Sequence, residues 1–378
     1  MSIVPSRHEL RKENQENIHP HLALKEDGVK QNIVRRGALG ELGNQLKDLH
    51  PEKVNNDKAT KPKEKVAVQL GGIKKVDNIA CKENLERKTV REKPNKESDE
   101  SPDSNDYTHD IMKYMQQLEL DFPIKKRFLT GTKVTASMRA KLVNWLVDVH
   151  KSFGMDHDTL FLAISVADRY LQVNRTVDRT QYQLVGTAAL MLAGKFIDVY
   201  PPSLEDYLYV CNDAFNKKQL LQMEVSLIKS LDFRLGFSIP IFFLRRYCKL
   251  AEVTLEEYQL SKYILELALL EYSVAHVRPS IQAAAAVCLA QAIFNDSMTP
   301  GLTYWTPVFE RVTSYTYADF KHVLHEFACI VNRAKTAKDN VVREKYASSK
   351  LMKISTNLRL QGKLIKKYAA IPVKHEMF

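Results

Sequence analysis

Two Ala-rich segments that are apolar on nearly every side constrain the fold of this chain most strongly. The first is QLVGTAALMLAGKF at residues 183–196, and the second is IQAAAAVCLAQAIF at residues 281–294, about a hundred positions further on. A helix that is apolar all round belongs at the centre of a domain, and small side chains let its neighbours approach closely. Because each segment follows two amphipathic helical patterns, we predict an all-α fold of two tandem five-helix bundles.

Helical spacing of apolar residues continues nearly everywhere after Tyr107, and no convincing strand-like alternation occurs. The helix that holds the first Ala-rich segment is expected over about residues 179–197, with the prolines at 201 and 202 stopping it. A short amphipathic helix is expected ahead of the bundles, with one apolar stripe formed by Ile111, Tyr114, Met115 and Leu118.

The first 106 residues differ from the rest in composition. They contain no Phe, Tyr or Trp and are rich in Lys, Glu, Asn and Asp. Such a segment buries too little apolar surface to offset its chain entropy, so we predict that residues 1–106 are disordered. After them we expect an N-terminal helix and linker over 107–134, a first bundle over 135–237, a second bundle over 238–340 and a basic tail over 341–378.

The formal net charge of +11 comes mainly from the end of the chain. Residues 333–378 carry 12 basic and 3 acidic side chains, whereas residues 107–332 carry 23 of each. A neutral body argues against nucleic acid as a partner. We therefore interpret the basic excess as a solvated tail rather than as a DNA-binding surface.

The cysteine pattern and the N-terminal sequence indicate the expected cellular compartment. Five cysteines are scattered and never spaced as CxxC, which excludes a zinc ribbon and gives no disulfide framework. The N-terminus has no apolar signal region, and no stretch reaches transmembrane length. We expect a soluble intracellular protein with no membrane partner, no metal and no cofactor.

Two lone charges on apolar helical faces single out a candidate site. Lys195 lies near the end of the first Ala-rich segment, and Glu224 interrupts the apolar pattern LLQMEVSLIKSL at 220–231. A buried charge without a partner is costly, so an acid and a base in these places predict a paired site. The pair is either a purely internal salt bridge or a rim pair that offers spare donor and acceptor atoms to a partner.

Several ordered motifs resemble the cyclin box, and the later ones resemble its B-type, mitotic form. They are MRAKLVNWLVDVH (138–150), the segment 183–196, YPP (200–202), QMEVSLIKSLDF (222–233), FLRRYCKL (243–250) and KYASSKLMKIS (345–355). Five positions that mark the cyclin box are all present: Arg139, Leu142, Asp168, Lys195 and Glu224. The resemblance covers roughly residues 107–356.

The resemblance implies a regulatory subunit that is not itself an enzyme. It would bind and allosterically activate a mitotic cyclin-dependent kinase, help to recruit substrates and drive passage from G2 into mitosis. It implies a buried ion pair between Arg139 and Asp168 that clamps the first two box helices; two solvated surface charges are the alternative. The kinase-binding positions that it implies are Lys195, Glu224, Leu192, Phe196, Asp198, Ile228, Phe233 and Leu235. In place of the acidic pair common in the family, this chain has Ile197 and then Asp198.

Two further binding sites follow from the resemblance. Met138, Leu142 and Trp145 fall on one stripe and imply an exposed patch for ArgXaaLeu motifs, with Gln183 and Asp148 beside it; ordinary core is the alternative. Lys141 replaces an aliphatic residue of the family there, which should weaken docking of a basic motif. A phosphate-binding spot is implied at Arg245 and Lys262, where Tyr258 stands in place of a His.

The N-terminal segment carries degradation motifs of the kind found in cyclins. Arg36, Leu39 and Asn44 fit the RxxL…N destruction box, and an extended chain suits a receptor groove. The tripeptide KEN occurs twice, at Lys12, Glu13 and Asn14 and at Lys82, Glu83 and Asn84. They imply destruction at mitotic exit through the anaphase-promoting ubiquitin ligase, in a protein of cytoplasm and nucleus.

Two other classes of function fit the sequence less well. A tandem cyclin-fold transcription factor pairs such repeats with a zinc ribbon and a basic surface, and this chain has neither in its neutral body. An enzyme requires a nucleophile–base or metal constellation, and the sequence offers none. The glycines of GALGELG at 37–43 lack a following GlyLysSer or GlyLysThr, so they do not indicate a nucleotide loop.

Overall fold

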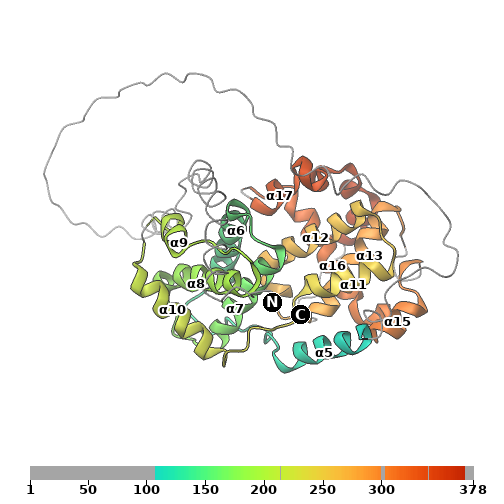
Figure 1. The fold of residues 1–378 in the computed structure, drawn as a ribbon. Helices are drawn as coiled ribbons and strands as arrows, with labels where there is room; N and C mark the ends of the chain where they lie inside the picture. Colours follow the sequence, from blue (N-terminus) through green and yellow to red (C-terminus); the bar gives the residue numbers. More distant parts are fainter. Residues whose placement is uncertain (1–106, 213, 299–302, 339, 371–378) are drawn as a thin grey trace, which may run out of the picture. The chain divides into compact units, whose positions relative to one another are not determined.

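The computed structural model of the protein describes residues 107–212, 214–298, 303–338 and 340–370. Within these ranges every regular element is a helix and no strand occurs, so the predicted all-α class of two tandem bundles is confirmed (Figure 1). The destruction box and both KEN tripeptides lie outside the described residues. No helix of the described ranges is long and apolar enough to cross a bilayer.

The first bundle surrounds the first Ala-rich segment. Its helices are α6 (Ala136–Phe153), α7 (His157–Val173), α8 (Arg179–Ile197), α9 (Leu204–Val210) and α10 (Lys217–Ser230). The predicted central helix α8 is buried from Leu184 through Gly194 and packs against α6, α7 and α10. The close approach of α6 to α8 requires a glycine at position 186, because a Cβ atom there would lie 2.8 Å from Leu142 Cδ2 of α6.

The second bundle repeats this plan around the second Ala-rich segment. Its helices are α11 (Pro240–Leu250), α12 (Leu255–Leu270), α13 (Pro279–Phe294), α15 (Pro307–Thr313) and α16 (Tyr317–Ala334), with the short 3₁₀ helix η1 (Tyr272–Val274) after α12. The central helix α13 is buried from Ser280 through Ala290 and packs against α11, α12 and α16. A run of four alanines at 283–286 lets these neighbours close in.

Side-chain caps set where the helices begin. Thr135 accepts a hydrogen bond from the Met138 amide at the start of α6, and Asp178 accepts from Thr180 and Gln181 at the start of α8. The predicted bounds of α8 are confirmed. The helix ends at Ile197, and residues 198–200 lie outside it, ahead of the two prolines.

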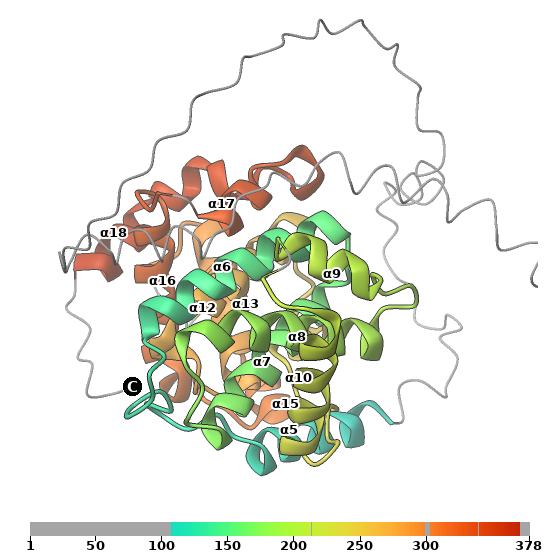
Figure 2. The ribbon, with the colours of Figure 1, turned by 90° about the vertical axis from the view of Figure 1, so that its left-hand side faces the viewer.

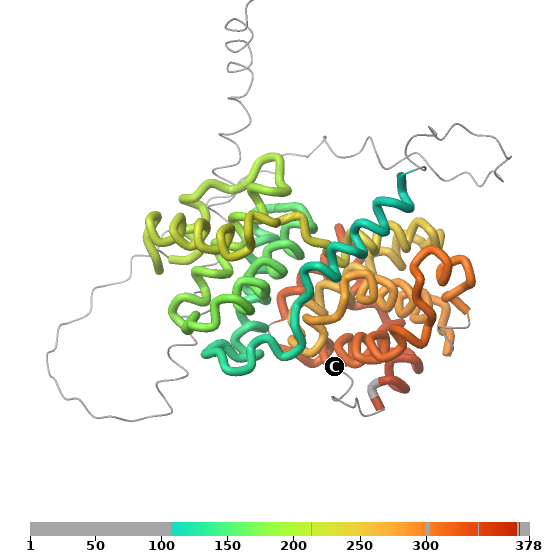
Figure 3. Tube along the Cα trace, turned by 90° about the horizontal axis from the view of Figure 1, so that it is seen from below, coloured from blue at the N-terminus to red at the C-terminus, as the bar shows by residue number. Residues whose placement is uncertain are grey.

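Helix α5 (Thr108–Asp121) exists as predicted, but it presents another face to the bundles. Ile111 and Tyr114 of the predicted stripe are exposed, whereas Met112 and Glu119 are buried. The backbone trace shows α5 running beside the second bundle (Figure 3). Glu119 accepts hydrogen bonds from the Ser280 amide at 3.0 Å and from Ser280 Oγ at 2.6 Å. The apolar pattern predicted the wrong buried face because Glu119 is acidic. A helical stripe that contains an acidic residue is ordinarily assigned to the solvent-facing side.

The prediction of a solvated C-terminal tail is wrong for residues 341–370. They form α17 (Val341–Tyr346), η2 (Ser349–Leu351), η3 (Ile354–Thr356), η4 (Leu358–Gln361) and α18 (Lys363–Ala370). Helix α17 packs against α6 and α12, and α18 packs against α16 (Figure 2). Val342, Tyr346, Leu364 and Ile365 are buried, so a few apolar anchors hold a segment whose overall composition is basic.

A buried carboxylate joins both bundles to this C-terminal segment. Glu266 of α12 accepts from Lys345 Nζ at 2.7 Å and from the Tyr346 hydroxyl at 2.6 Å. His157 Nδ1 of the first bundle lies 3.1 Å from the same carboxylate. Burial alone raises the pKa of Glu266, but the proximity of His157 and Lys345 outweighs it and lowers this pKa to about 2. Glu266 is therefore a structural anion.

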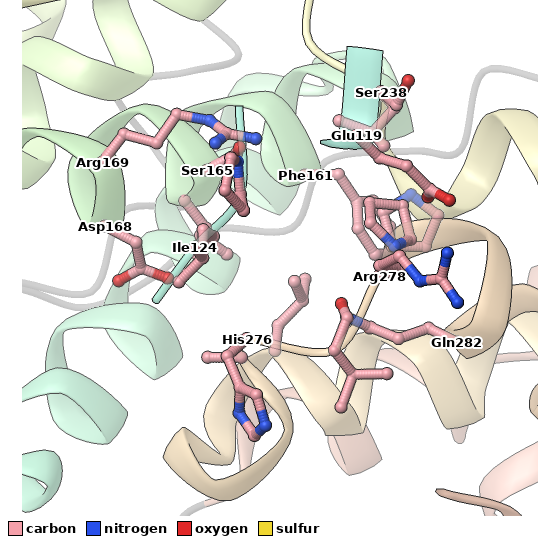
Figure 4. A pocket seen from close by; sticks show the side chains of 18 of the residues that line it. Glu119, Ile124, Phe161, Ser165, Asp168, Arg169, Ser238, His276, Arg278 and Gln282 are labelled. Atoms are coloured by element: carbon pink, nitrogen blue, oxygen red, sulfur yellow. The ribbon is translucent and has the colours of Figure 1, made fainter. Parts of the chain in front are cut away.

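A small cavity of about 70 Å³ lies between the bundles, lined by α5, the linker after it, α7 and the start of α13 (Figure 4). Arg169 stands at its wall, with its guanidinium 4.0 Å from the centre of the Phe237 ring. Burial lowers the pKa of Arg169 to about 10. The cavity lies at the boundary between the two bundles, along the linker that follows α5.

Candidate functional site

Lys195 and Glu224 meet at the surface of the first bundle. Lys195 Nζ, at the end of α8, donates to Glu224 Oε1 of α10 at 2.7 Å. The Lys195 side chain is 48% exposed and the Glu224 side chain 15% exposed. The pair is therefore not sealed inside the bundle. Spare N–H donors and one carboxylate oxygen remain for an external group, which matches the rim arrangement rather than the internal one.

Exposed aromatic side chains accompany this ion pair. Phe196, next to Lys195, is 56% exposed, and Phe233, just after α10, is 68% exposed. Asp232 and Phe233 both have positive φ, of 52° and 58°. A bulky residue in that conformation costs of order 1–3 kcal/mol and is held only where the surroundings dictate it. The Phe233 amide donates to the Ile228 carbonyl at 2.9 Å, which fixes the turn.

The other predicted apolar anchors are less accessible than expected. Ile228 is half-buried, and Leu192 and Leu235 are buried, so these leucines offer little accessible surface and their role as anchors of the kinase interface stays a prediction. Both belong to the core of the bundle. Helical spacing places a residue on a face, but it does not say how deep that face lies.

Asp198 has an internal role at the end of α8. Its Oδ1 accepts from the Asp156 amide at 2.8 Å, and its Oδ2 accepts from Thr159 Oγ1 at 2.7 Å. Both donors lie at the N-terminus of α7, where free amide groups and the helix dipole favour a negative charge. Asp198 thus ties α8 to α7, and its predicted kinase contact stays untested.

Arg139 and Asp168 form a buried bidentate pair that joins α6 to α7. Arg139 Nε donates to Oδ1 at 2.9 Å and Arg139 Nη2 donates to Oδ2 at 2.7 Å, with side-chain exposures of 2% and 4%. Arg139 Nη1 also donates to the Leu269 carbonyl of the second bundle at 2.8 Å. The residue that clamps two helices of one bundle therefore also holds the other bundle.

The predicted docking patch is not an exposed surface in this structure. Met138 and Trp145 are each 8% exposed and Leu142 is 1% exposed, and all three belong to the core. Of the three, Leu142 lies against Gly186 of α8. The expectation of an exposed patch is therefore wrong, because the spacing i, i+4, i+7 describes a core face equally well. Gln183 is half-buried, while Asp148 and Lys141 are exposed.

The predicted phosphate spot is partly occupied by the protein itself. Arg245 donates to both carboxylate oxygens of Asp158, at 2.8 and 2.5 Å. Lys262 is 8% exposed, with its Nζ 5.6 Å from the centre of the Tyr258 ring. Burial lowers the pKa of Lys262. Since Asp158 already balances the charge of Arg245, phosphate binding there stays a prediction.

Sequence reasoning missed other exposed apolar residues on the same elements. Val199 and Tyr200 follow α8 and are 84% and 81% exposed, and Val225 lies beside Glu224 and is 48% exposed. The signal was the apolar pair that stands between Asp198 and the two prolines, outside any helical pattern. Together with Phe196 and Phe233 they are exposed apolar side chains on α8, on α10 and on the residues just after these helices.

Comparison with known proteins gives the family. Residues 110–236 match the family described as cyclin, N-terminal domain, and residues 238–359 match cyclin, C-terminal domain. The chain belongs to the cyclin family. The two matches meet near residue 237, where the junction of the bundles was expected. The viral cyclin of herpesvirus saimiri shares the fold, with a TM-score of 0.52 and 20% identity, and the similarity covers 59% of this chain and 97% of the viral one.

Relatives within the family are of the B type. The G2/mitotic-specific cyclin-B2 of Oryzias luzonensis is 35% identical over 361 residues, which cover 89% of this chain and 91% of that protein. The cyclin-B2 of Bos taurus is 40% identical over 268 residues, and the cyclin-B of Patella vulgata is 37% identical over 261. Those two matches cover 70% and 69% of this cyclin but only 66% and 62% of the relatives. The predicted resemblance to B-type cyclins is confirmed.

Proposed function

We propose that this cyclin binds and activates a mitotic cyclin-dependent kinase through the surface around Lys195 and Glu224. The observation that carries the proposal is the ion pair at 2.7 Å on an exposed rim, with the exposed Phe196 next to Lys195 in the sequence and the exposed Phe233 just after α10. A charged pair flanked by exposed aromatic residues has the composition of a binding hot spot, in which apolar anchors surround a few directional hydrogen bonds.

The proposed mechanism is a shift of the kinase between two conformations. The cyclin binds the state whose regulatory helix is turned inward, and binding energy for that state alone moves the equilibrium toward it. The inward helix completes the Lys–Glu pair of the kinase and frees its activation loop. In this proposal the cyclin takes no part in the phosphoryl transfer itself.

The test removes the pair and leaves the fold intact. We expect Lys195→Ala with Glu224→Ala to weaken binding to a mitotic cyclin-dependent kinase at least about tenfold, since hot-spot truncations commonly cost more than 1 kcal/mol. Kinase affinity is measured by calorimetry, and histone phosphorylation reports activation. Phe233→Gly should also weaken binding while relieving the positive φ of that residue.

A matched control exists on the same bundle. Lys217 and Glu205 form an exposed pair at 3.3 Å between α10 and the start of α9, with side-chain exposures of 63% and 71%. Their double alanine variant should leave kinase affinity within a factor of two. If the Lys195/Glu224 variant melts at the wild-type temperature and still activates the kinase fully, the proposed surface is incorrect.

The proposal extends to turnover and location. The motifs at 36–44, 12–14 and 82–84 support recognition by the anaphase-promoting ubiquitin ligase at mitotic exit in a protein of cytoplasm and nucleus. Deleting residues 36–44 should prolong its half-life at mitotic exit, measured by cycloheximide chase. A half-life equal to that of the wild type would count against the destruction box.

A further inference from the structure

A groove between the two bundles lies apart from the proposed kinase surface. It has a volume of about 380 Å³ and is formed by α6, α12, α16 and the residues after α16. This is within the range of sites that hold small ligands or single side chains of a docked peptide. None of its lining residues belongs to α8 or α10, so the groove and the Lys195/Glu224 pair are made by different elements.

The floor of the groove is apolar and made of small or branched side chains. The apolar side chains that line it include Ala140 of α6, Leu270 of α12, and Ile330 and Ala334 of α16. Ile330 and Ala334 are buried, while Ala140 and Leu270 are half-buried. Such a floor accommodates one aliphatic side chain without desolvating a polar group of the cyclin.

The rim of the groove is cationic. Lys141 and Lys338 both line it, both are exposed, and neither forms an ion pair with any described residue. The third basic side chain, Arg333, is already balanced by Glu326 at 3.2 Å and Glu271 at 3.5 Å. Among the described residues, Lys141 and Lys338 are therefore the rim charges without an ion-pair partner, and both flank an apolar floor.

The walls are held by hydrogen bonds that span the groove and its neighbour α17. Asn144 Oδ1 of α6 accepts from the Val341 amide at 3.0 Å, and Arg343 Nη1 donates to the Lys335 carbonyl at 2.8 Å. These contacts fix the segment that carries Lys338 relative to α6. A preformed groove lowers the ordering cost of binding.

We propose that this groove docks a short acidic peptide segment of a partner protein. One aliphatic side chain, such as leucine, would occupy the floor between Ala140 and Ile330, and carboxylates on either side of it would face Lys141 and Lys338.

The test measures peptide binding to the full chain by fluorescence anisotropy. The probe is a labelled peptide with one leucine between two pairs of glutamates, compared with the same peptide carrying serine for leucine and with an ArgXaaLeu peptide. We expect the acidic leucine peptide to bind about tenfold more tightly than either comparison peptide, and its affinity to fall as salt rises.

Variants assign the binding to the groove. Lys141→Glu with Lys338→Glu should weaken the acidic peptide about tenfold, and Ala140→Trp, which fills the floor without changing charge, should weaken it as much. Lys350→Glu alters an exposed lysine of η2 outside the groove and should change affinity less than twofold. Thermal melting verifies that each variant is folded.

Three results would overturn the inference. The first is no binding of the acidic peptide at millimolar concentration. The second is equal binding by the charge-reversed and wild-type chains. The third is displacement of the peptide by duplex DNA at lower concentration than by unlabelled peptide, which would make the groove a nucleic-acid surface. None of these results depends on kinase binding, so failure here is distinguishable from failure of the proposed function.

Discussion

At the scale of single residues, His150 shows how the fold controls a charge. Its side chain is 3% exposed, and its Nε2 lies 2.8 Å from the Asp156 carbonyl, to which only a protonated nitrogen can donate. Burial, assisted by the nearby charge of Lys345, lowers the pKa of His150 to about 4. His157 and Glu266 are the other ionisable neighbours. His150 is therefore neutral in the folded protein at physiological pH.

His150 should make stability depend on pH below neutrality. The unfolded chain takes up a proton near pH 6.5 and the folded chain does so only near pH 4, so the free energy of unfolding falls as pH drops through that interval. The loss should approach roughly 3 kcal/mol over the interval. Urea unfolding at a series of pH values measures it. In His150→Gln this part of the pH dependence should vanish, and an unchanged slope in that variant would contradict the assignment.

At the scale of helices, the approach of α6 to α8 depends on Gly186. Adding a Cβ there would place it 2.8 and 2.9 Å from the two terminal carbons of Leu142. Leu142 is itself 1% exposed and has little room to move. The contact explains why a glycine, which is a poor helix former, stands in the middle of the central helix.

Gly186→Ala should destabilise the first bundle despite the higher helix propensity of alanine. Overpacking in a dense core costs about 1–3 kcal/mol, which exceeds the roughly 1 kcal/mol that propensity contributes. Gly194→Ala is the matched control, because its nearest neighbour would be the flexible end of Met155, at 2.7 Å. Chemical denaturation measures the free energy of unfolding of both variants. Equal stability of the two variants would mean that α6 can shift away at little cost.

At the scale of the whole molecule, Glu266 makes the C-terminal segment part of the folded body. Its carboxylate is fully buried and relies on Lys345 and Tyr346 of α17 and on His157 of the first bundle. Removing a partner from a buried ion pair leaves an uncompensated charge, and such changes cost about 3–5 kcal/mol. Residues from three separate parts of the sequence therefore stabilise one another.

Truncation after residue 340 should lower the free energy of unfolding by at least about 3 kcal/mol, because it strands Glu266 and uncovers the surfaces that α17 and α18 protect. Thermal and urea unfolding measure the loss. The same truncation combined with Glu266→Leu should recover part of it, since no buried charge then remains. A truncated chain as stable as the full one would show that the segment is dispensable, as a solvated tail would be.

Local patterns in the sequence predict the helices, the repeat of two bundles around Ala-rich centres and the junction near residue 237. These features depend on local periodicity and on side-chain size, which can be recognised in short stretches of the sequence. Lys195 and Glu224 were also found this way, because a lone charge in an apolar helix has to be compensated.

Which helix faces are buried follows from the packing of distant segments against one another. Glu119 of α5 is buried, Met138 and Trp145 lie in the core, and the basic segment 341–370 packs onto the bundles. Glu266 and Lys345 are 79 positions apart, and no local pattern reveals that they touch. How deeply a side chain is buried, and which residue it contacts, depend on segments that are distant in the sequence. Periodicity reports only the direction in which a side chain leaves its helix.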